Sequence, residues 1–552
     1  MLRLLEPVRL FRVLGRAAAP TAKRARYSTP SSSLISFAAA RTPTIFAPAT
    51  GKGKSAISIL RISGDDALEV WRRMTLPARG MRGDSGRRRR EPPERRAVLR
   101  RVVHPETKEV LDEAVVLYFP ASSALTAQPT LELHLHGSPA LMQLLLRLLP
   151  TLSSSSTPSS SSSPSAPQLG PFRIAEPGEF TRLAFEAGKM DLTEVEGIRD
   201  LVEAETEQQR RLAARQASGH IRQAYDAMRA TAIEAMALVE ALIDFGEDEG
   251  ISEGVFEQAR EKVTSLVSQI EKHLDDGRRG EIIRQGIQLA IIGPPNAGKS
   301  SLLNWLAQRE AAIVTAVPGT TRDVVELSLD FHGFPIQVAD TAGLRKTVDE
   351  VERIGIERAV QIAESADVKL CVISLAELFP PSSASSAPPS TPVIDSQTLS
   401  LLTPSTLLIL NKADAAPPTD AQLDSLLAVL EKEGKSWMGK ERGRDGLVRV
   451  SVKEGEGLGE LAERLKAEVK ARFDLSDNLE ETPIVTHERH RRHLEDCLAS
   501  LTAFLEMDPS GFDLVDAGEE LRYATLALGK ITGAVDVEEV LGEIFRGFCI
   551  GK

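Results

Sequence analysis

The chain has 552 residues, enough for three or four domains of ordinary size. Hydrophobic residues make up 42% and charged residues 26%, which excludes global disorder. A net charge of −11 argues against a protein coated in basic charge, although it leaves room for a local nucleic-acid patch. No apolar run reaches the roughly 18 residues of a membrane span. Three cysteines lie far apart and offer neither a disulfide framework nor paired metal ligands: Cys371, Cys497 and Cys549.

The first 41 residues have the composition of a targeting segment. Seven Arg or Lys residues fall within the first 26 positions, Glu6 is the one acid among them, and a Ser/Thr-rich stretch follows. This pattern predicts a mitochondrial transit peptide over residues 1–41. The alternative is a disordered basic tail.

The remaining segments differ in their periodicity. Residues 42–186 mix short β-like runs with one apolar helical run, which predicts an N-terminal α+β domain. Residues 187–285 and 474–552 have helical periodicity, whereas 286–473 alternate strands and helices in an α/β pattern. Because helical segments flank the α/β block, we expect that block to be inserted into a discontinuous helical domain.

Three low-complexity segments interrupt this pattern. Residues 151–168 are rich in Ser and residues 380–400 in Ser and Pro, which is typical of flexible insertions with little to bury. Residues 79–101 are rich in Arg, and we interpret them as a solvated loop, with nucleic-acid binding as the alternative.

A phosphate-binding loop follows the apolar run at 288–292. Residues 293–300 read Gly-Pro-Pro-Asn-Ala-Gly-Lys-Ser, and a helical run follows them. Glycines let consecutive backbone N–H groups surround a phosphate, and the helix N-terminus adds a positive field. Lys299 would bring charge to the outer phosphates and Ser300 a hydroxyl to Mg²⁺. This strand–loop–helix context predicts a nucleotide site.

Three further motifs follow predicted strands in the order that a GTPase requires. Asp340-Thr341-Ala342-Gly343 offers an acid for the Mg²⁺ shell and a backbone N–H for the γ-phosphate. In the motif at 411–414, Asp414 can accept hydrogen bonds from the N1–H and 2-amino groups of guanine, a donor pair that adenine lacks. The Ser-Val-Lys run at 451–453 would brace the base. Together the motifs predict GTP binding.

The catalytic elements depart from the commonest pattern. Many GTPases place a Gln after the Asp-x-x-Gly motif to orient the attacking water, whereas this chain has Leu344, which cannot hydrogen-bond water. Among the charged residues that follow, Glu352 is our candidate for that role, and the alternative is a solvated helix charge. The transition state also needs a cation. A monovalent ion held by Asn296 and the loop at 315–321 would supply it.

With these motifs the sequence resembles the tRNA-modification GTPases of the bacterial MnmE (TrmE) type and their mitochondrial counterparts. The resemblance runs from about residue 44 to the end, apart from the insertions, and its most specific marks are Pro-Gly-Glu-Phe at 177–180 and Phe-Cys-Ile-Gly-Lys at 548–552. The other matching segments are 59–64, 189–192, 296–303, 311–315, 318–323, 340–345 and 351–359.

The resemblance implies three parts and a mechanism. The N-terminal α+β domain would bind a tetrahydrofolate derivative (5,10-methylene or 5-formyl) and mediate homodimerisation, and the helical domain would carry a Ras-like G domain of the P-loop NTPase class. Family members hydrolyse GTP when two G domains meet, with K⁺ in place of an arginine finger. The reaction implied is formation of a carboxymethylaminomethyl-type group at the wobble uridine C5 of tRNA, together with an FAD-dependent partner in a hetero-oligomer in the mitochondrial matrix.

The resemblance also assigns roles to residues of this chain. It implies K⁺ ligation by Asn296, Thr320 and the carbonyls of Thr315 and Val317, and Mg²⁺ ligation by Ser300 and Thr321. Glu352 matches the catalytic glutamate, Cys549 matches a C-terminal cysteine with a supporting role, and four residues match folate contacts: Arg61, Glu132, Lys189 and Lys552. The GTP-contacting set is Asn296, Ala297, Gly298, Lys299, Ser300, Ser301, Thr315, Ala316, Val317, Pro318, Gly319, Thr320, Thr321, Asp340, Thr341, Ala342, Gly343, Asn411, Lys412, Ala413, Asp414, Ser451, Val452 and Lys453.

Two loops that flank the implied folate pocket depart from the family pattern, at 51–56 and 126–129. A folate carries glutamate carboxylates and a pterin ring, which suit a cation and one carboxylate respectively. The identity of the added amine stays open among glycine, taurine and ammonia.

A histidine cluster near a predicted helix start has no sequence neighbour that completes a zinc ligand set. His487, His490 and His493 are spaced three residues apart, with arginines at 489, 491 and 492. We interpret this segment as a basic helix end near tRNA or a partner, in preference to a metal site.

Two other functions are alternatives to tRNA modification by a GTPase. A ribosome-assembly GTPase would share the nucleotide motifs, but such proteins usually add a basic or Gly-rich RNA-binding module, in place of which this chain has a helical frame. A folate-dependent aminomethyl transferase with a regulatory G domain would differ from a tRNA-modification GTPase only in the acceptor that it uses.

Overall fold

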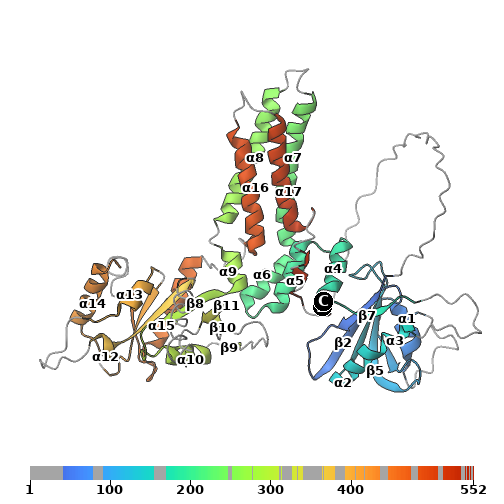
Figure 1. Cartoon of the computed structure of the whole chain (residues 1–552), viewed down its shortest axis with the longest axis horizontal. Helices are drawn as coiled ribbons and strands as arrows, with labels where there is room; N and C mark the ends of the chain where they lie inside the picture. The colour runs from blue at the N-terminus through green and yellow to red at the C-terminus, as the bar shows by residue number, and fades with distance from the viewer. Residues whose placement is uncertain are drawn as a thin grey trace, which may run out of the picture.

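The structure is a computed structural model of the whole chain. It describes residues 42–78, 91–154, 169–245, 252–275, 278–309, 312–313, 326–331, 333–339, 364, 366–379, 392–404, 406–415, 417–435, 446–473, 483–507, 514–535, 541–542, 544–545, 547–548 and 551. The residues expected to form the transit peptide, and most of each predicted insertion, lie outside this set. A helical bundle stands between two regions built around β-sheets (Figure 1).

The N-terminal region contains one seven-stranded sheet in the order β3-β4-β5-β6-β2-β1-β7. Its buried face packs against helices around a core that includes Phe46, Trp71 and Leu133. The elements are β1 (Thr44–Pro48), β2 (Ser55–Ser63), α1 (Ala67–Met74), β3 (Thr75–Pro77), β4 (Val98–Val103), β5 (Val110–Phe119), β6 (Thr130–Gly137), α2 (Pro139–Leu148), α3 (Thr151–Ser154) and β7 (Phe172–Ile174). This is the predicted α+β architecture.

Helices then lead from the first sheet to the bundle and on to the second sheet. Asp191 accepts from the Glu194 N–H, and the Glu194 side chain accepts from the Asp191 N–H, so α5 begins with a capping box. The helices are α4 (Glu179–Glu186), α5 (Leu192–Glu203), α6 (Glu207–Ala217), α7 (His220–Phe245), α8 (Ser252–Leu274) and α9 (Arg279–Gln285).

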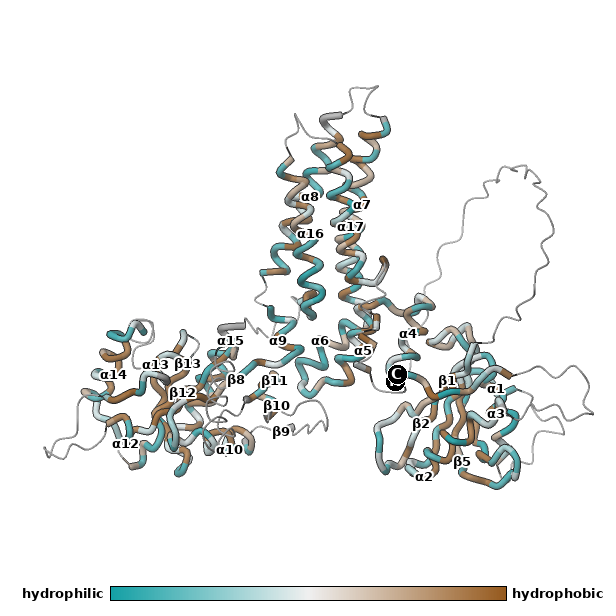
Figure 2. The backbone as a smooth tube through the Cα atoms, viewed as in Figure 1, coloured by the Kyte–Doolittle hydropathy of each residue, from teal (hydrophilic) through white to brown (hydrophobic). Residues whose placement is uncertain are grey.

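The bundle is formed by α7 and α8 with α16 (Glu488–Glu506) and α17 (Leu514–Thr532), which come from opposite sides of the second sheet in the sequence. Its core residues are spaced alternately four and three positions apart along the helix. This spacing forms an apolar seam that packs helices almost parallel to one another. In α7 these residues are Ile221, Tyr225, Met228, Ala232, Ala235, Val239 and Leu242. Figure 2 shows hydrophobic residues along the facing sides of these helices. The helical part is therefore discontinuous in sequence, as predicted.

The second sheet has the strand order β14-β13-β12-β8-β11-β10-β9, and β8, β11, β12, β13 and β14 run parallel. Two apolar cores lie on its opposite faces. The strands are β8 (Ile287–Ile292), β9 (Ala312–Ile313), β10 (Glu326–Phe331), β11 (Phe334–Ala339), β12 (Val368–Ser374), β13 (Thr406–Asn411) and β14 (Leu447–Arg449), and the helices are α10 (Lys299–Arg309), α12 (Leu375–Leu378), α13 (Ser396–Leu401), α14 (Asp420–Lys432) and α15 (Leu458–Phe473).

Among the described helices, none is both long and apolar enough to cross a membrane.

Candidate functional site

The phosphate-binding loop lies at the carboxyl end of β8, in the middle of the parallel sheet. Gly293 has φ +135°, and a Cβ there would lie 2.1 Å from the carbonyl oxygen of Val372, so the turn requires glycine. Lys299 Nζ donates to the carbonyls of Gly293 and Pro294 at 2.8 and 2.7 Å, which holds its charge over the loop. Ser300 and Ser301 follow in the first turn of α10, and the N–H groups at a helix N-terminus suit a phosphate.

A buried asparagine connects this loop to the segments expected to bind guanine. Asn411, 3% exposed, donates from Nδ2 to the Ala297 carbonyl at 2.7 Å, and its Oδ1 accepts from the Val452 N–H at 3.2 Å. Gly298 lies so close that a Cβ there would be 2.1 Å from Asn411 Nδ2. The loops after β8, β13 and β14 are therefore joined at one edge of the sheet, where ligands of open parallel sheets bind.

The carboxylate proposed to recognise guanine is held in its ionised form. The Ser451 hydroxyl donates to Asp414 Oδ1 at 2.7 Å, and this hydrogen bond lowers the pKa of Asp414. The Asp414 side chain is exposed, so it can accept from ligand donors. Lys412 adopts φ +63° between these residues, and Lys453 is exposed and pairs with Glu454.

Many predicted site residues lie outside the described residues. These are Thr315, Ala316, Val317, Pro318, Gly319, Thr320, Thr321, Asp340, Thr341, Ala342, Gly343, Glu352, Cys549 and Lys552. Asp340 directly follows Ala339, the last residue of β11, a strand that runs parallel to β8. Asn296 is described: it is exposed in the phosphate-binding loop, with φ +59°.

A second group of predicted residues meets on the N-terminal sheet. Arg61 on β2 donates from Nε to Glu132 Oε1 on β6 at 2.9 Å, and its guanidinium lies 5.6 Å from the centroid of the Phe180 ring. Arg61 Nη1 also donates to the Gly551 carbonyl at 3.4 Å, so the C-terminal tail reaches this pair. Lys189 is exposed after α4, and among the described side chains no hydrogen bond or ion pair joins it to Arg61 or Glu132.

The surroundings of this pair combine charge with an aromatic face. His134 Nε2 lies 3.4 Å from Glu132 Oε2, and the pair is partly exposed. A cation, a carboxylate and an aromatic ring side by side suit a ligand with both carboxylates and ring N–H donors, so these residues fit a folate.

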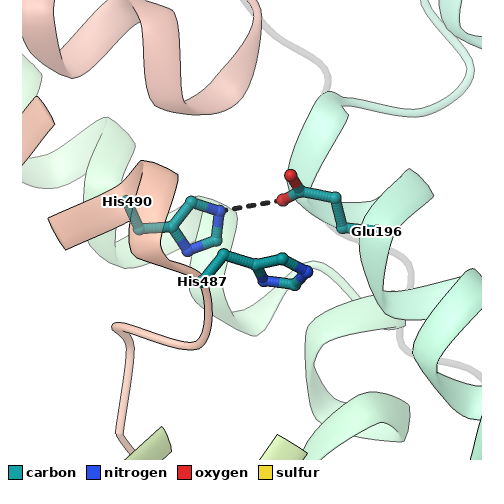
Figure 3. A group of neighbouring side chains, drawn as sticks. All are labelled: Glu196, His487 and His490. Atoms are coloured by element: carbon teal, nitrogen blue, oxygen red, sulfur yellow. Dashed lines mark hydrogen bonds and ion pairs between the residues drawn. The ribbon is translucent and has the colours of Figure 1, made fainter. Parts of the chain in front are cut away.

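The histidine cluster differs from the sequence interpretation. Glu196 on α5, almost 300 residues away in the chain, accepts from His490 Nε2 at 2.8 Å, and His487 lies beside them (Figure 3). One ligand atom of each of these three residues lies within 4.8 Å of the others, so the nearby carboxylate that the sequence did not reveal is present. Arg489, however, donates to both oxygens of Glu196, at 3.0 and 2.9 Å.

These contacts form a clamp between helices. Arg489 pairs with Glu196 and Arg491 with Glu281, each at 2.9 Å, so these two side chains contact other helices of the chain, contrary to the interpretation of a basic helix end near tRNA or a partner. Burial lowers the pKa of His487 to about 4 and also lowers that of His490, which keeps both rings neutral at neutral pH. Burial raises the pKa of Glu196, but the Arg489 guanidinium and the hydrogen bond from His490 outweigh it and hold this pKa well below its usual value.

Sequence reasoning missed Glu196, but a signal was present. It lies one turn after Leu192 and next to Val195, on the buried face of α5, where an acid needs a partner. The sequence does not reveal the partner of Glu196, because α16 comes only after the inserted sheet region in the chain.

The inserted sheet with its phosphate loop, guanine-binding motif and bracing loop defines a P-loop GTP-binding protein, in which the nucleotide domain interrupts a helical domain. Comparison with known protein families supports this class. A model of the MnmE helical domain matches residues 192–549, and a model of the GTP-binding protein TrmE N-terminus matches residues 44–189.

Curated relatives match over nearly the whole chain. The tRNA modification GTPase MnmE of Parvibaculum lavamentivorans is 40% identical over 92% of this chain and 100% of its own length. A Danio rerio protein, the mitochondrial 5-taurinomethyluridine tRNA synthase subunit GTPB3, is 39% identical over 92% of this chain and 93% of its own. The G domain of the T. maritima FeoB iron transporter covers 33% of this chain and 98% of its own at 23% identity, with a TM-score of 0.21, too low to define the fold.

The chain belongs to the MnmE family of tRNA modification GTPases. It is a GTP hydrolase, consistent with the nucleotide motifs and with relatives named as GTPases.

Proposed function

We propose that this chain is a K⁺-dependent GTPase that acts with an FAD-dependent partner to modify C5 of the wobble uridine in mitochondrial tRNA. The observation that carries the proposal is the co-occurrence, in one chain, of the joined GTP loops and the Arg61–Glu132 pair reached by the C-terminal tail. The name of the zebrafish relative supports a mitochondrial location and makes taurine the first amine to test. A ribosome-assembly factor would have no need for the second site.

The nucleotide site would bind GTP with its described residues. Asp414 would accept from the guanine base, Lys299 would face the outer phosphates, and Ser300 would hold Mg²⁺ together with Thr321. Since Leu344 cannot orient water, Glu352 would do so. A bound K⁺ would supply positive charge against the charge that develops on the phosphates, and Asn296, exposed in the phosphate loop, fits as one of its ligands along with Thr315, Val317 and Thr320.

The second site would bind a tetrahydrofolate derivative, which supplies the one-carbon unit when bound. Glu132 would accept from the N–H donors of the pterin ring, and Arg61, Lys189 and Lys552 would attract its carboxylates. Cys549 would support the chemistry at this end of the chain. Catalysis in a homodimer, with the two G domains facing one another, completes the proposal.

The deciding experiment measures GTP turnover of the chain from residue 42 onward in KCl and in NaCl at several protein concentrations. We expect turnover at least about ten-fold faster in KCl, because a cation at the transition state is worth far more than that in related GTPases, and a rise with concentration steeper than linear. Asn296→Ala should lose the K⁺ preference while still binding GTP. Asn304→Ala, an exposed asparagine on α10, is the matched control and should keep it. Equal rates in both salts would rule out the K⁺ mechanism.

A further inference from the structure

Helix α5 carries two neighbouring rows of side chains that contact different parts of the molecule. Glu196 and Asp200 are one turn apart on one row, and Val195 and Arg199 are one turn apart on the adjacent row. The first row contacts the segments that lead into the nucleotide domain and the bundle, and the second contacts the C-terminal tail.

The first row is connected to the nucleotide domain through α9. Arg284 Nε donates to both oxygens of Asp200, at 3.0 and 3.1 Å, and α9 ends two residues before β8, the strand that leads into the phosphate loop. Gln209 Nε2 on α6 donates to the Arg284 carbonyl at 3.0 Å. Any displacement of β8 relative to the bundle therefore acts on the Asp200–Arg284 ion pair.

A second contact comes from the hairpin formed by β10 and β11. The hydroxyl of Ser328 on β10 donates to Glu205 Oε2, in the turn between α5 and α6, at 2.6 Å. This hairpin lies in the sequence between 315–321 and 340–343, both predicted to contact the nucleotide. The structure thus links the nucleotide domain to α5 through α9, and to the turn that follows α5 through this hairpin.

The second row of α5 contacts the C-terminal tail, by which we mean the described residues from Phe545 to Gly551. Val195 packs with Phe545 and Phe548 in one buried cluster. At Gly547 a Cβ would lie 2.3 Å from Arg199 Nη1, so the tail backbone lies directly against this guanidinium. Four residues further on, the Gly551 carbonyl accepts from Arg61.

The middle of α5 is fixed to the bundle. Glu196 is 4% exposed and is held by Arg489 and His490 on α16, and Arg489 also donates to the carbonyls of Lys530 and Ile531 at the end of α17. Separating a buried ion pair is costly, so Glu196, one turn before Asp200 on the same row, is a fixed contact of the helix. Beside Asp200 a pocket of ≈ 130 Å³, lined also by Glu203, Gln209 and Arg284, gives the ion pair room to rearrange.

We propose that α5 couples the nucleotide domain to the C-terminal tail, with Asp200 as the positioning residue on the nucleotide side and Val195 and Arg199 on the tail side. Nucleotide exchange shifts Arg284, and α5 passes the shift to the tail beside Arg61 and Glu132. The inference needs only nucleotide binding. It does not depend on the ion, folate or tRNA chemistry proposed above, so its failure is distinguishable from theirs.

The tail can be followed through its own thiol in the full-length chain. Burial raises the pKa of the Cys371 and Cys497 thiols to about 12, so these react slowly, and the alkylation rate of Cys549 by N-ethylmaleimide can be read by mass spectrometry. We expect this rate to differ about five-fold or more between the complexes with GDP and with a non-hydrolysable GTP analogue, the usual lower range for coupled sites.

Asp200→Asn should remove that difference while both nucleotides still bind, and Asp200→Glu should restore part of it. Asp226→Asn, which removes a surface carboxylate paired with Arg222 on α7, is the matched control and should keep the wild-type difference. A wild-type rate indifferent to the nucleotide, or a difference that survives in Asp200→Asn, would overturn the proposal.

A reciprocal measurement covers the case in which Asp200→Asn does not fold. Because coupling is mutual, loosening the tail must change the ratio of GTP-analogue to GDP affinity. Phe548→Ala and Val195→Ala should each move this ratio, measured by fluorescence titration, toward that of the uncoupled protein. An unchanged ratio in both variants would contradict coupling through α5.

Discussion

At the scale of single residues, the nucleotide site depends on positions where no side chain fits. Gly298 has φ +102° and lies against the amide of Asn411, which itself holds the Ala297 carbonyl. Gly298→Ala therefore combines backbone strain with a clash, and we expect GTP affinity to fall at least about ten-fold, the equivalent of one lost hydrogen bond at the upper end of its range. Titration with a fluorescent GTP analogue measures it.

A glycine on the adjoining helix is the control for this substitution. Gly459, near the start of α15, has no atom within 4 Å of a Cβ position. Gly459→Ala should leave GTP affinity unchanged and stabilise the chain slightly, by up to about 1 kcal/mol, since alanine is the better helix former. Equal GTP affinities for the two alanine variants would contradict the packing argument.

The residue scale is also where the sequence was most informative. The phosphate loop and the guanine motif could be predicted because each is a short run with a fixed chemistry after a strand, and the strands expected before them are present as β8 and β13. The hydrogen bond from Asn411 to Ala297 could not be predicted, because its two partners are 114 residues apart in the sequence.

At the scale of secondary-structure elements, the start of α5 makes the chain sensitive to pH. Burial raises the pKa of Asp191, its N-cap, from 3.8 to about 6. Between these values the native state keeps a proton that the unfolded chain has released, so this contribution to stability is complete below about pH 4 and is lost as the pH rises through 6.

Asp191→Asn keeps the capping oxygen and removes the buried charge. At pH 7 we expect the variant to be more stable than the wild type by about 1–3 kcal/mol, and we expect this difference to disappear near pH 4. Urea unfolding at both pH values checks it. Asp226→Asn, which removes a more exposed carboxylate near Arg222, should show no such change across that window. A pH-independent gain in Asp191→Asn would show that burial of the charge is not the cause.

Elements of the helical part show where prediction from sequence ends. Helical periodicity on both sides of the α/β segment predicted one interrupted domain, and the seam residues of α7 and α17 do meet in one core. The clamp of Glu196 with Arg489 and His490 could not be foreseen, because charged residues are ordinarily exposed and only the tertiary pairing of α5 with α16 buries them.

At the scale of the whole molecule, the two ends of the described chain lie together. Gly551 has φ +103°, and a Cβ there would lie 1.9 Å from the Pro48 carbonyl at the end of β1. Figure 1 shows the C-terminus beside the N-terminal sheet, at the foot of the bundle. The candidate folate site is therefore assembled from opposite ends of the sequence.

Gly551→Ala should move the tail away from β1 and break the hydrogen bond from Arg61 to the Gly551 carbonyl. We expect affinity for 5-formyl-tetrahydrofolate to fall about ten-fold, as for the loss of one charge-assisted hydrogen bond. Equilibrium dialysis measures it. Gly434→Ala is the matched control, because Gly434 also has a positive φ (+78°) but no neighbour within 4 Å. A full-strength folate complex in the Gly551 variant would show that the tail does not contribute.

The interrupted bundle has a consequence for synthesis. Helices α7 and α8 end at Leu274, and their partners begin only at Glu488. At about 5–20 residues per second the ribosome needs on the order of 10–40 seconds to make the intervening roughly 200 residues. During that time the apolar seam of the first helical hairpin has nothing to cover it. The nascent chain should therefore depend on a holding chaperone during elongation, until the last two helices emerge and close the bundle.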